Sequence, residues 1–372
     1  MSPKHIVIDG RIRRTSTGRY VDRLVEHLQD IDSFNRYTIL IQPDDPWRPR
    51  AKNFSSMACP FPQFSFNPLH QIKFAQQLKA LRADLVHFPM NQQPLLYRGT
   101  VVTTTMDTTM LHFTRAGRTP LPIFWLKMAG YRYLFWASNR RSKQVITITN
   151  FVKNELETMY GFMKGKTTTT YCASEPPLQT KAEQPQNVVK NGKFLLAVGT
   201  AFPHKNLQSL VDAHKILVKK YPDLRLYFAG KKEYYYGLLD IYIEQNTNAD
   251  MVKTLGFVND AELKWLYQNC AAYVFPSLSE GFGLPPLEAM THGAPAVCSS
   301  ASCIPEVCGD AAIYFDPHSP ADMAEKIEFI LADNNLREQQ IKKGYEQIKK
   351  YSWERMAQET LSVYTKALQA DN

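Results

Sequence analysis

Short apolar runs rich in β-branched residues alternate along the chain with longer stretches in which apolar positions recur every three or four residues. The short runs predict buried strands, and the helical period predicts amphipathic helices. In the first half, the predicted strands are residues 5–9, 37–42, 84–88, 101–105 and 144–149. The predicted helices are residues 20–31, 68–82 and 150–160. Near-continuous apolar strands separated by helices are typical of a parallel sheet that is covered on both faces.

A second series of the same kind follows residues 173–192, where Pro, Gln and Lys are frequent and a linker is expected. Its predicted strands are residues 194–199, 224–230, 252–257, 271–277 and 295–300. Its predicted helices are residues 207–221, 260–269, 286–292 and 320–333. The pattern therefore predicts an α/β fold of two doubly wound, Rossmann-like domains facing each other across a cleft. Ligands of such domains bind beyond the carboxyl ends of the strands.

The domain boundaries follow from these two series. We expect an N-terminal domain over residues 1–172, the linker over 173–192 and a C-terminal domain over 193–352, followed by a last helix over 353–372. The 372 residues exceed what one hydrophobic core ordinarily serves, which agrees with two domains. With 44% hydrophobic and 21% charged residues, the composition is globular and argues against a disordered, collagenous or coiled-coil protein.

The sequence also disfavours a membrane-spanning protein and a metal-binding protein. No apolar stretch reaches the roughly 18 residues that a membrane-spanning helix needs. The first residues run directly into a strand-like segment and lack the apolar stretch of a signal peptide. The six cysteines form neither a C-x-x-C pair nor a standard zinc spacing, so we expect buried thiols in a reducing cytosol.

The formal net charge of +9 is unevenly distributed. Residues 1–170 carry 24 basic and 11 acidic side chains, whereas the remainder carries 20 basic and 24 acidic ones. A basic half next to a mildly acidic half indicates that one domain faces an anionic partner. Nucleic acid, an anionic membrane surface and a phosphorylated acceptor all satisfy this condition.

Residues 276–290, PSLSEGFGLPPLEAM, carry the most informative pattern, between a predicted strand and a predicted helix. Gly281 and Gly283 let the backbone approach a ligand closely, and the free N–H groups of the helix start attract an anion. Glu280 lies on the loop and Glu288 in the expected first helical turn. Two carboxylates near an anion site repel it unless they bind hydroxyls, which sugars and ribose supply. The alternative is a plain turn before a helix whose own start Glu288 caps.

With its surroundings, this stretch resembles the family-four glycosyltransferases of the GT-B fold. The resemblance covers nearly all of the second half of the chain and, more loosely, the first. The matching stretches are residues 255–258 (LGFV), 263–277 (LKWLYQNCAAYVFPS), 279–290 (SEGFGLPPLEAM), 292–297 (HGAPAV), 304–317 (IPEVCGDAAIYFDP) and 351–353 (YSW). The resemblance also implies that the last helix crosses back to the N-terminal domain.

The resemblance implies roles for residues in the second half. Glu280 would contact hydroxyls of the donor sugar, and Glu288 would bind the ribose of the nucleotide. The backbone amides that would join Glu280 belong to Gly281, Phe282, Gly283 and Leu284. Phe257 and Val258 would lie near the base.

Residues 199–207 resemble the family's phosphate-contacting loop. This resemblance implies that the following residues lie near the donor: Gly199, Thr200, His204 and Lys205. Lys205 would stabilise the charge that the departing diphosphate gains, which makes it a catalytic candidate beside Glu280. The alternative for Lys205 is a solvated lysine at a helix start. His204 stands where many relatives carry Arg, so a second permanent cation is not expected there.

The first half resembles the family more loosely. Residues 16–20 (STGRY) resemble the glycine loop after the first strand, where Gly18 would open a path toward the donor phosphates and the acceptor. Many relatives have two glycines here, and this chain has Ser16 at the earlier position. An ordinary turn is the alternative.

A departure from the family follows the strand at residues 101–105. Relatives often carry His-Asp there, with the histidine near the transferred sugar, and Met106 takes the apparent place of that histidine. Asp107 is then the candidate acceptor-side catalytic carboxylate, and the alternative is a turn or helix-cap aspartate. His112 could compensate for the missing histidine, although a loop histidine is more often a surface or packing residue.

The family's reaction moves a sugar from a nucleotide donor with retention of anomeric configuration and without a bound metal. No Asp-x-Asp signature follows a strand here, and we expect no cofactor besides the donor substrate. A double displacement would need a carboxylate nucleophile beneath the anomeric carbon, and no motif requires one. In the same-face alternative, the leaving phosphate accepts the acceptor's proton, and the protein supplies orientation and charge stabilisation.

A basic, aromatic segment lies in the first half. No acidic residue occurs between Asp107 and Glu155. The cations of the segment are Arg115, Arg118, Lys127, Arg132, Arg140, Arg141 and Lys143, interleaved with Phe124, Trp125, Tyr131, Tyr133, Phe135 and Trp136. A basic helix with aromatic residues can lie on an anionic bilayer, and the alternative is a core helix with solvated ends. Nucleic-acid binding is disfavoured because no recognition motif accompanies the charge.

These observations together predict a retaining glycosyltransferase. It would move a hexose from a nucleotide-diphosphate sugar, GDP-mannose before UDP-linked sugars, to a glycan or lipid-linked glycan. The expected place is the cytoplasm, with peripheral contact at the inner face of the membrane. A GT-B epimerase or phosphorylase is disfavoured by residues 280–284. A non-catalytic nucleotide-sugar-binding subunit stays open, since Met106 and His204 depart from the family pattern.

Overall fold

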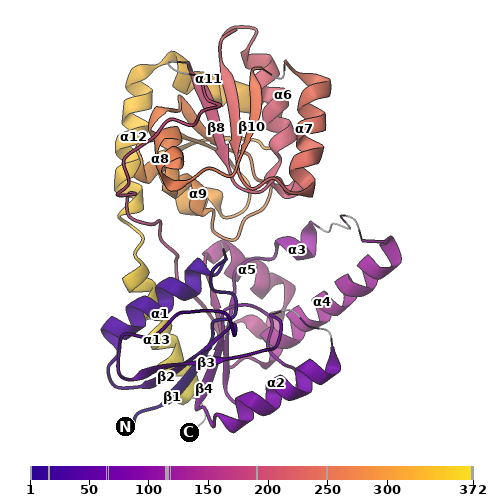
Figure 1. Ribbon diagram of the computed structural model, residues 1–372, viewed down its shortest axis with the longest axis vertical. Coiled ribbons are helices and arrows are strands. Elements are labelled where there is room, and N and C mark those ends of the chain that lie inside the picture. Colours follow the sequence, from indigo (N-terminus) through magenta and orange to yellow (C-terminus); the bar gives the residue numbers. More distant parts are fainter. Residues whose placement is uncertain are drawn as a thin grey trace. The chain divides into compact units, whose positions relative to one another are not determined.

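The computed structural model describes residues 2–369 apart from residues 16, 64, 66, 114–116, 118, 190, 191 and 249. The chain forms two compact units, which Figure 1 shows coloured along the sequence. Unit 1 comprises Met1–Cys172 and Ser352–Asn372, and unit 2 comprises Ala173–Tyr351. Each unit has its own sheet and its own buried residues.

The sheet of unit 1 has seven parallel strands in the order β3-β2-β1-β4-β5-β6-β7. The strands are β1 (His5–Asp9), β2 (Arg36–Ile41), β3 (Phe54–Ala58), β4 (Leu85–Phe88), β5 (Val101–Thr105), β6 (Gln144–Thr147) and β7 (Thr167–Thr169). Every residue of β1, β4, β5 and β6 is buried, as expected for strands covered on both faces. Because β1 pairs with both β2 and β4, the winding reverses between β1 and β4, where ligand crevices form in such sheets.

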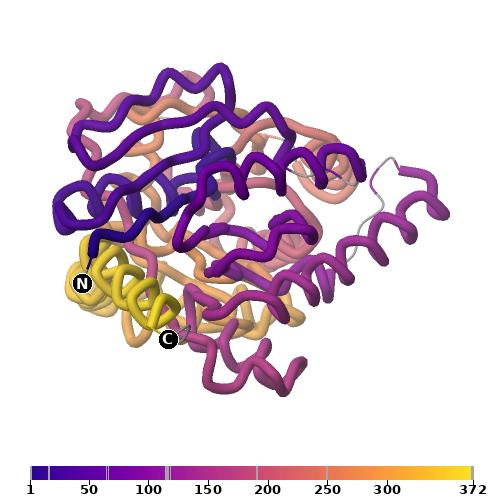
Figure 2. Tube along the Cα trace, turned by 90° about the horizontal axis from the view of Figure 1, so that it is seen from below, coloured from indigo at the N-terminus to yellow at the C-terminus, as the bar shows by residue number. Residues whose placement is uncertain are grey.

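The helices of unit 1 come from both ends of the chain. They are α1 (Arg19–Ile31), α2 (Pro68–Ala80), α3 (Thr109–His112), α4 (Leu121–Arg141), α5 (Asn150–Met159), the 3-10 helix η1 (Gly161–Met163) and α13 (Trp353–Gln369). Figure 2 shows α13, in yellow, beside the N-terminal segment, and α13 packs on α1. Both helices bury residues at three- and four-residue spacing, such as Leu24 and Leu28 in α1 and Thr360 and Tyr364 in α13.

The sheet of unit 2 has six parallel strands in the order β10-β9-β8-β11-β12-β13. The strands are β8 (Phe194–Val198), β9 (Arg225–Ala229), β10 (Val252–Gly256), β11 (Ala272–Phe275), β12 (Ala296–Ser299) and β13 (Ala312–Phe315). The helices are η2 (Pro203–Lys205), α6 (Leu207–Leu217), α7 (Tyr234–Asn246), α8 (Asp260–Asn269), α9 (Leu284–Thr291), α10 (Ile304–Cys308), η3 (Gly309–Ala311), α11 (Pro320–Ala332) and α12 (Asn334–Ile348). The winding reverses between β8 and β11, since β8 pairs with β9 on its other side.

The predicted fold class is confirmed, because both units are parallel α/β sheets with helices between the strands. Several elements were not predicted. They include the strands β3, β7 and β13, of which β3 and β7 are rich in Ser and Thr. Helix α7 is apolar around much of its surface, and α12 is mostly polar, so neither shows a clear helical stripe.

The start of α9 differs from the prediction. The helix begins at Leu284, two residues before the predicted start at Pro286, and both prolines occupy its first turn, where proline is favoured. Gly283 stands before it in the left-handed conformation, with φ of +83°. Glu288 is therefore the fifth residue of α9 and lies in the second turn, so the expectation of a first-turn position was wrong.

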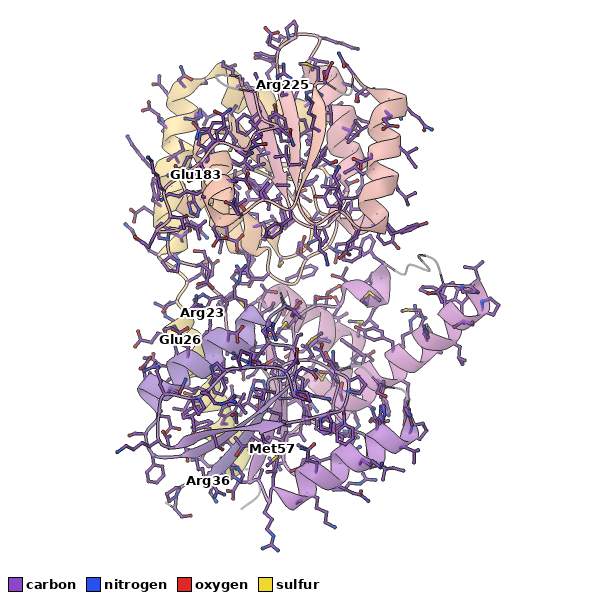
Figure 3. All side chains as sticks on the ribbon, viewed as in Figure 1. Arg23, Glu26, Arg36, Met57, Glu183 and Arg225 are labelled. Carbon is purple, nitrogen blue, oxygen red and sulfur yellow. The ribbon has the colours of Figure 1, made fainter. Side chains whose placement is uncertain are left out.

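The segment predicted as a linker groups with unit 2, of which it forms the beginning. Lys264 of α8 donates hydrogen bonds to the carbonyl oxygens of Leu178 and Thr180, at 2.7 and 2.9 Å. The backbone N–H of Glu183, which Figure 3 labels, donates to the carbonyl oxygen of Ala261 at 3.1 Å. Residue Val188 is buried. Backbone hydrogen bonds and apolar burial thus attach this irregular segment to the surface of unit 2.

All six cysteines of the chain are buried free thiols. Burial raises the pKa of the Cys270 thiol to about 12 and the pKa of the Cys172 thiol well above its ordinary value. The predicted buried thiols are therefore present in the structure. A thiol whose pKa is raised by apolar surroundings is a poor nucleophile, so Cys172 and Cys270 act as packing residues.

Candidate active site

The candidate site of unit 2 is built on the two loops that follow β8 and β11, at the point where the winding of the sheet reverses. Strand β8 leads into η2, which ends at Lys205. Strand β11 leads into residues 276–283, which end at the start of α9. The Leu278 N–H donates a 2.7 Å hydrogen bond to the carbonyl oxygen of His204, and this contact joins the two loops. Parallel α/β sheets bind ligands at such a place.

Lys205 and Glu280, which the sequence separates by 75 residues, form an ion pair across these loops. The Nζ of Lys205 lies 2.6 Å from Oε1 of Glu280, and the two side chains are 20% and 12% exposed. The same Nζ lies 5.8 Å from the ring centroid of Phe275, at the end of β11. A partly buried cation and carboxylate that hold each other form a charge-assisted hydrogen bond and fix each other's position. The pair thus places one positive and one negative group at the carboxyl edge of the sheet.

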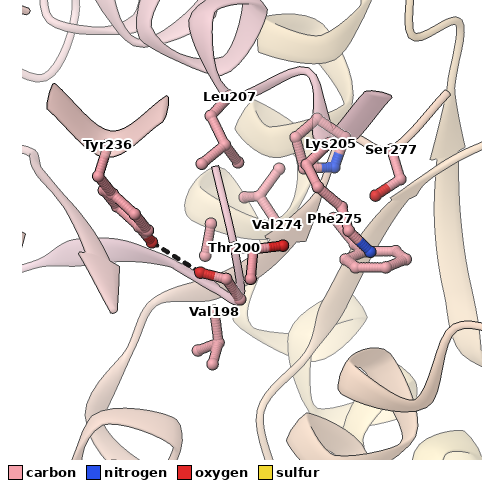
Figure 4. A pocket seen from close by; sticks show the side chains of 11 residues that line it. Val198, Thr200, Lys205, Leu207, Tyr236, Val274, Phe275 and Ser277 are labelled. Atoms are coloured by element: carbon pink, nitrogen blue, oxygen red, sulfur yellow. Dashed lines mark hydrogen bonds between the residues drawn. The ribbon is translucent and has the colours of Figure 1, made fainter. Parts of the chain in front are cut away.

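A small cavity lies beside Lys205, and Figure 4 shows it from close by. Gly199 and Thr200 line it together with Tyr236 and Ser277. Gly199 has φ of +136°, which favours glycine, and no atom lies within 4 Å of the position that a Cβ would take. The hydroxyl of Tyr236 donates a 2.8 Å hydrogen bond to the Gly199 carbonyl oxygen, the contact dashed in Figure 4. The backbone after β8 is therefore fixed in a conformation that leaves space next to a lysine.

Gly230, at the end of β9, permits this arrangement, and the sequence did not single it out. A Cβ at Gly230 would lie 1.9 Å from the Gly199 carbonyl oxygen and 2.6 Å from the Tyr236 hydroxyl. The Gly199 N–H donates to the Ala229 carbonyl oxygen at 2.9 Å, and the Gly230 N–H donates to that of Gly256 at 2.9 Å. The carboxyl ends of β8, β9 and β10 are thus held in close register. In the sequence, the feature that could have marked Gly230 is its position at the end of a predicted strand.

The loop that carries Glu280 is held from a second side by residues that precede α10. The Glu280 N–H donates to Oγ of Ser302 at 3.1 Å, and the thiol of Cys303 donates to the Glu280 carbonyl oxygen at 3.2 Å. Ser302 has φ of +54°, an uncommon conformation for a serine. Both backbone groups of Glu280 are therefore occupied, so its carboxylate projects from a fixed base. No sequence signal marked Ser302 or Cys303 as contacts of this loop.

The glycine-rich loop itself divides into backbone and packing positions. Gly281 and Leu284 are half-buried, and Gly283 is buried before the first turn of α9. The side chain of Phe282 is only 4% exposed and packs edge-on against the ring of Tyr351, with centroids 5.5 Å apart. Phe282 can therefore serve a ligand only through its backbone. This eight-residue helix starts with Leu284, and because Pro285 and Pro286 carry no N–H, Leu284 and Leu287 are the backbone donors among its first four residues.

Four further predicted positions lie around this edge. Phe257 follows β10 and is 80% exposed, which leaves its ring open for stacking on a planar group. Val258 beside it is half-buried. The ring of His204 stacks on Phe202, with centroids 6.0 Å apart. Glu288 is half-buried in α9, and its carbonyl oxygen lies 2.8 Å from Nδ1 of His292.

In unit 1, Gly18 stands directly before α1 and after β1. A Cβ at Gly18 would lie 2.2 Å from the Ile12 carbonyl oxygen, so the close approach of two backbone segments requires glycine here. The Gly18 N–H donates to Oγ1 of Thr15 at 3.0 Å. Ser16, the second position of interest in this loop, lies outside the described residues. The close approach accounts for Gly18 structurally.

Two arginines that the sequence did not single out hold the loop after β1. Arg11 is buried and pairs with Asp9 at 2.6 Å, and its guanidinium lies 4.1 Å from the ring centroid of Phe74. Arg13 binds Asp22 of α1 and, at 3.2 Å, Asp45. A buried ion pair of this kind needs its other hydrogen-bonding groups satisfied, and Arg11 also donates to two backbone carbonyl oxygens. These contacts give the loop before Gly18 a defined shape.

Asp107 follows β5 in unit 1, and its Oδ1 accepts the N–H of Thr109 at 2.9 Å. This contact is the one expected if Asp107 is a turn aspartate, which was the alternative to a catalytic role. It occupies one carboxylate oxygen, and the second oxygen can make other contacts. His112 lies 3.2 Å from Glu155, which also accepts the hydroxyl of Thr108. Gly18 and Asp107 thus belong to unit 1, whereas the loops around Lys205 and Glu280 belong to unit 2.

Two family models together match most of the chain. The model of glycosyltransferase family 4 matches residues 17–174, and the model of the glycosyl transferases of group 1 matches residues 179–347. Within the described residues, no helix has both the length and the apolar character to span a bilayer.

Two curated proteins of Escherichia coli are similar to parts of the chain. The O-antigen chain mannosyltransferase B is 32% identical over 234 residues, which cover 60% of each chain. The serotype-specific mannosyltransferase WbdA is 32% identical over 182 residues, which cover 48% of this chain and 22% of the relative. The chain thus covers less than two thirds of the length of either relative.

Among solved structures, a sucrose-phosphate synthase from Thermosynechococcus elongatus has a similar fold. The two structures superpose with a TM-score of 0.76 at 16% sequence identity. The match covers 99% of this chain and 100% of the synthase chain. At this level of identity, the similarity establishes the architecture alone.

Proposed function

Because the chain belongs to the group 1 glycosyltransferases, family 4, with the GT-B fold, we propose that it transfers a hexose from a nucleotide-diphosphate sugar to a glycan or lipid-linked glycan. Unit 2 takes the donor, and the basic unit 1 takes the acceptor. The observation that carries the proposal is the Lys205–Glu280 pair at the winding reversal of the unit 2 sheet.

The pair supports a donor site because it offers two kinds of recognition. A diphosphate that approaches Lys205 exchanges the carboxylate partner of the ammonium for a phosphate oxygen. Glu280 is then released to accept hydroxyls of the sugar while its backbone stays bound to Ser302 and Cys303. A charge-assisted hydrogen bond of this sort contributes about 1.5–3 kcal/mol.

The remaining donor contacts are proposed around this pair. The space beside Gly199 and Thr200 receives phosphate oxygens, and the backbone amides from Gly281 to Leu284 face the sugar and diphosphate. The exposed ring of Phe257, with Val258, contacts the base, and Glu288 binds the ribose hydroxyls.

The proposed reaction keeps the anomeric configuration and needs no metal. The bond between the anomeric carbon and the phosphate oxygen breaks, and the acceptor oxygen attacks from the same face. The departing phosphate takes the acceptor's proton, so the protein need not supply a base. Lys205 neutralises the charge that develops on the diphosphate, and Asp107 of unit 1 orients the acceptor hydroxyl. The contribution of the chain is then orientation and charge stabilisation.

GDP-mannose is the proposed donor, and UDP-linked sugars are the alternative. The support is that the two curated relatives are an O-antigen chain mannosyltransferase and a serotype-specific mannosyltransferase. The same support favours a polysaccharide precursor as acceptor. The proposed place of action is the cytoplasm, at the inner face of the membrane, where buried thiols stay reduced.

A second candidate is a non-catalytic subunit that binds nucleotide sugars. It is favoured by Met106 in place of histidine and by the Asp107 contact to Thr109, which suits a turn residue. Such a protein would bind the donor at Lys205 without consuming it.

Turnover of GDP-mannose, with and without added glycan acceptor, separates the two candidates. We expect wild-type turnover to persist in EDTA and to fall at least a hundredfold in Glu280→Gln. The matched control is Glu346→Gln in the pair of Glu346 with Lys349 at the end of α12, which has the same 2.6 Å distance but is exposed. Equal turnover in wild type and Glu280→Gln would reject the catalytic role, and donor binding without turnover would favour the subunit.

A further inference from the structure

A cavity of about 360 Å³ lies in unit 1 between the carboxyl end of α2 and the segments that precede β4 and β5. Its apolar wall is formed by Ala75, Leu78, Ala83, Leu96 and Tyr97. The other lining residues are Lys79, Arg82, Arg98 and Gly99. The cavity therefore lies at the amino edge of the sheet, whereas the proposed transfer reaction uses carboxyl edges. Its volume is within the range of small-molecule sites.

Three exposed cations surround this cavity, namely Lys79, Arg82 and Arg98. No acidic side chain lines it, and in the described part of the chain none of the three cations forms an ion pair. The charge of Arg98 also reaches Arg141 at the end of α4, whose pKa is lowered by burial and by that charge. Because these like charges repel one another, an anion that binds among them is stabilised.

Arg82 occupies a backbone position that ordinarily favours glycine. It follows Leu81, the C-cap of α2, and has φ of +47°. Glycine is the usual residue at this place after a helix, because a Cβ makes the left-handed conformation unfavourable. The dipole of α2 accounts for cations at its carboxyl end, such as Lys79 and Arg82, but not for Arg98 on a separate segment. Non-glycine residues held in this conformation cluster at ligand-binding sites.

The ring of Tyr97 forms one wall of the cavity, and Gly99 makes room for its hydroxyl. A Cβ at Gly99 would lie 2.2 Å from that hydroxyl oxygen. The backbone of Tyr97 is fixed, since its carbonyl oxygen accepts a 2.5 Å hydrogen bond from Arg141 and its N–H donates to Pro94 at 3.1 Å. Among the described residues, the Tyr97 hydroxyl itself has no hydrogen-bond partner. It is therefore available to donate to a ligand oxygen.

We propose that this cavity binds a small, soluble phosphate monoester that carries an apolar group. Such a group has about two negative charges at neutral pH and three acceptor oxygens. The guanidinium groups of Arg82 and Arg98 match pairs of phosphate oxygens, and Lys79 adds a third charge. The Tyr97 hydroxyl donates to the same phosphate, and the apolar group contacts Leu96 and the rest of the apolar wall. The site is distinct from the one proposed for sugar transfer.

Calorimetric titration of the full chain with phenyl phosphate tests the proposal. We expect phenyl phosphate to bind about tenfold more tightly than inorganic phosphate, because its ring is removed from water. Arg82→Gly and Arg98→Gln should each weaken its binding about tenfold, the effect of one lost charge-assisted hydrogen bond. Arg82→Gly should also melt at the wild-type temperature or above, because glycine relieves the positive φ. Lost binding is thereby separated from lost folding.

The matched control is Arg36→Gln, which removes an exposed arginine at the start of β2, on the same edge of the sheet but outside the cavity. It should bind phenyl phosphate as wild type does. Arg82→Gly and Arg98→Gln should in turn bind GDP as wild type does, so the two proposals fail separately. Lys205→Met should keep its affinity for phenyl phosphate, because Lys205 belongs to unit 2.

Three outcomes would overturn the proposal. The first is equal affinity of wild type, Arg82→Gly and Arg98→Gln for phenyl phosphate. The second is loss of phenyl phosphate binding in Lys205→Met, which would assign the compound to the site in unit 2. The third is much tighter binding of dihexanoyl phosphatidic acid, titrated as a soluble monomer, than of phenyl phosphate, because the ligand would then be a lipid headgroup.

Discussion

The imidazole of His87 in β4 and the phenol of Tyr364 in α13 meet inside unit 1, although 277 residues separate them. Nδ1 of His87 lies 2.7 Å from the Tyr364 hydroxyl, and Nε2 lies 2.8 Å from Oγ1 of Thr104. The Tyr20 hydroxyl of α1 lies 3.2 Å from the same threonine oxygen. A buried polar chain thus joins the last helix to the sheet and to α1.

The stability of the protein should depend on pH through His87. Full burial lowers the pKa of His87 to about 3, from an ordinary value of 6.5. As the pH falls from about 6.5 toward 3, the unfolded chain takes a proton that the folded chain refuses, so stability is lost in this window. The loss is about 1.4 kcal/mol per pH unit, and none arises above pH 6.5.

Urea unfolding of wild type and His87→Gln between pH 7 and 4.5 measures this effect. We expect the pH slope of the unfolding free energy to be smaller in the variant but not zero, because burial of His5 and His214 lowers the pKa values of both side chains as well. The exposed His318 provides the control, and His318→Gln should keep the wild-type slope. An unchanged slope in His87→Gln would contradict the assignment.

The anchoring of Glu280 by Ser302 predicts a loss of activity without a comparable loss of stability. The Ser302→Gly variant lacks the hydroxyl that accepts a hydrogen bond from the Glu280 N–H. Glycine adopts the positive φ at this position without strain. We expect donor turnover to fall about tenfold, mainly in kcat, because a carboxylate that is displaced loses contacts to the reacting sugar. The unfolding free energy should change by no more than about 1.5 kcal/mol, the contribution of one hydrogen bond. Full turnover in Ser302→Gly would show that Ser302 has no positioning role.

Two glycine positions in unit 2 should respond oppositely to alanine. In Gly230→Ala, the new Cβ meets the Gly199 carbonyl oxygen at 1.9 Å, so the backbone beside Lys205 must shift. We expect a destabilisation of about 3 kcal/mol or more, and weaker thermal stabilisation by nucleotide sugars. Gly237 lies inside α7 with no atom within 4 Å of the position that a Cβ would take, so Gly237→Ala should stabilise the protein by up to about 1 kcal/mol. Thermal unfolding of wild type and both variants tests this prediction. Equal melting temperatures of Gly230→Ala and wild type would contradict the close approach at Gly230.

The sequence was sufficient for features that repeat along the chain or stand together in one motif. The alternation of apolar strands and helices predicted both parallel sheets, and the stretch from Glu280 to Leu284 predicted the turn before α9. Contacts between distant segments were not predictable. Nothing local in Ser302 indicates that its hydroxyl accepts the Glu280 N–H, and Gly230 looks like any glycine after a strand. The ion pair of Lys205 with Glu280 likewise depends on strand order, because β8 and β11 are neighbours in the sheet although two strands separate them in the sequence.

Binding of the donor at Lys205 is the central claim, and calorimetric titration tests it most directly. GDP-mannose, UDP-glucose, GDP and GMP are titrated into wild type, Lys205→Met and the control Lys349→Met, which alters an exposed lysine directly after α12. We predict that Lys205→Met weakens GDP-mannose and GDP binding by about tenfold to a hundredfold, an effect of about 1.4–2.7 kcal/mol. The affinity for GMP, which lacks the second phosphate, should fall less in Lys205→Met. The Lys349→Met control should bind every ligand as wild type does. Unchanged affinity of Lys205→Met for the diphosphate ligands would contradict the account.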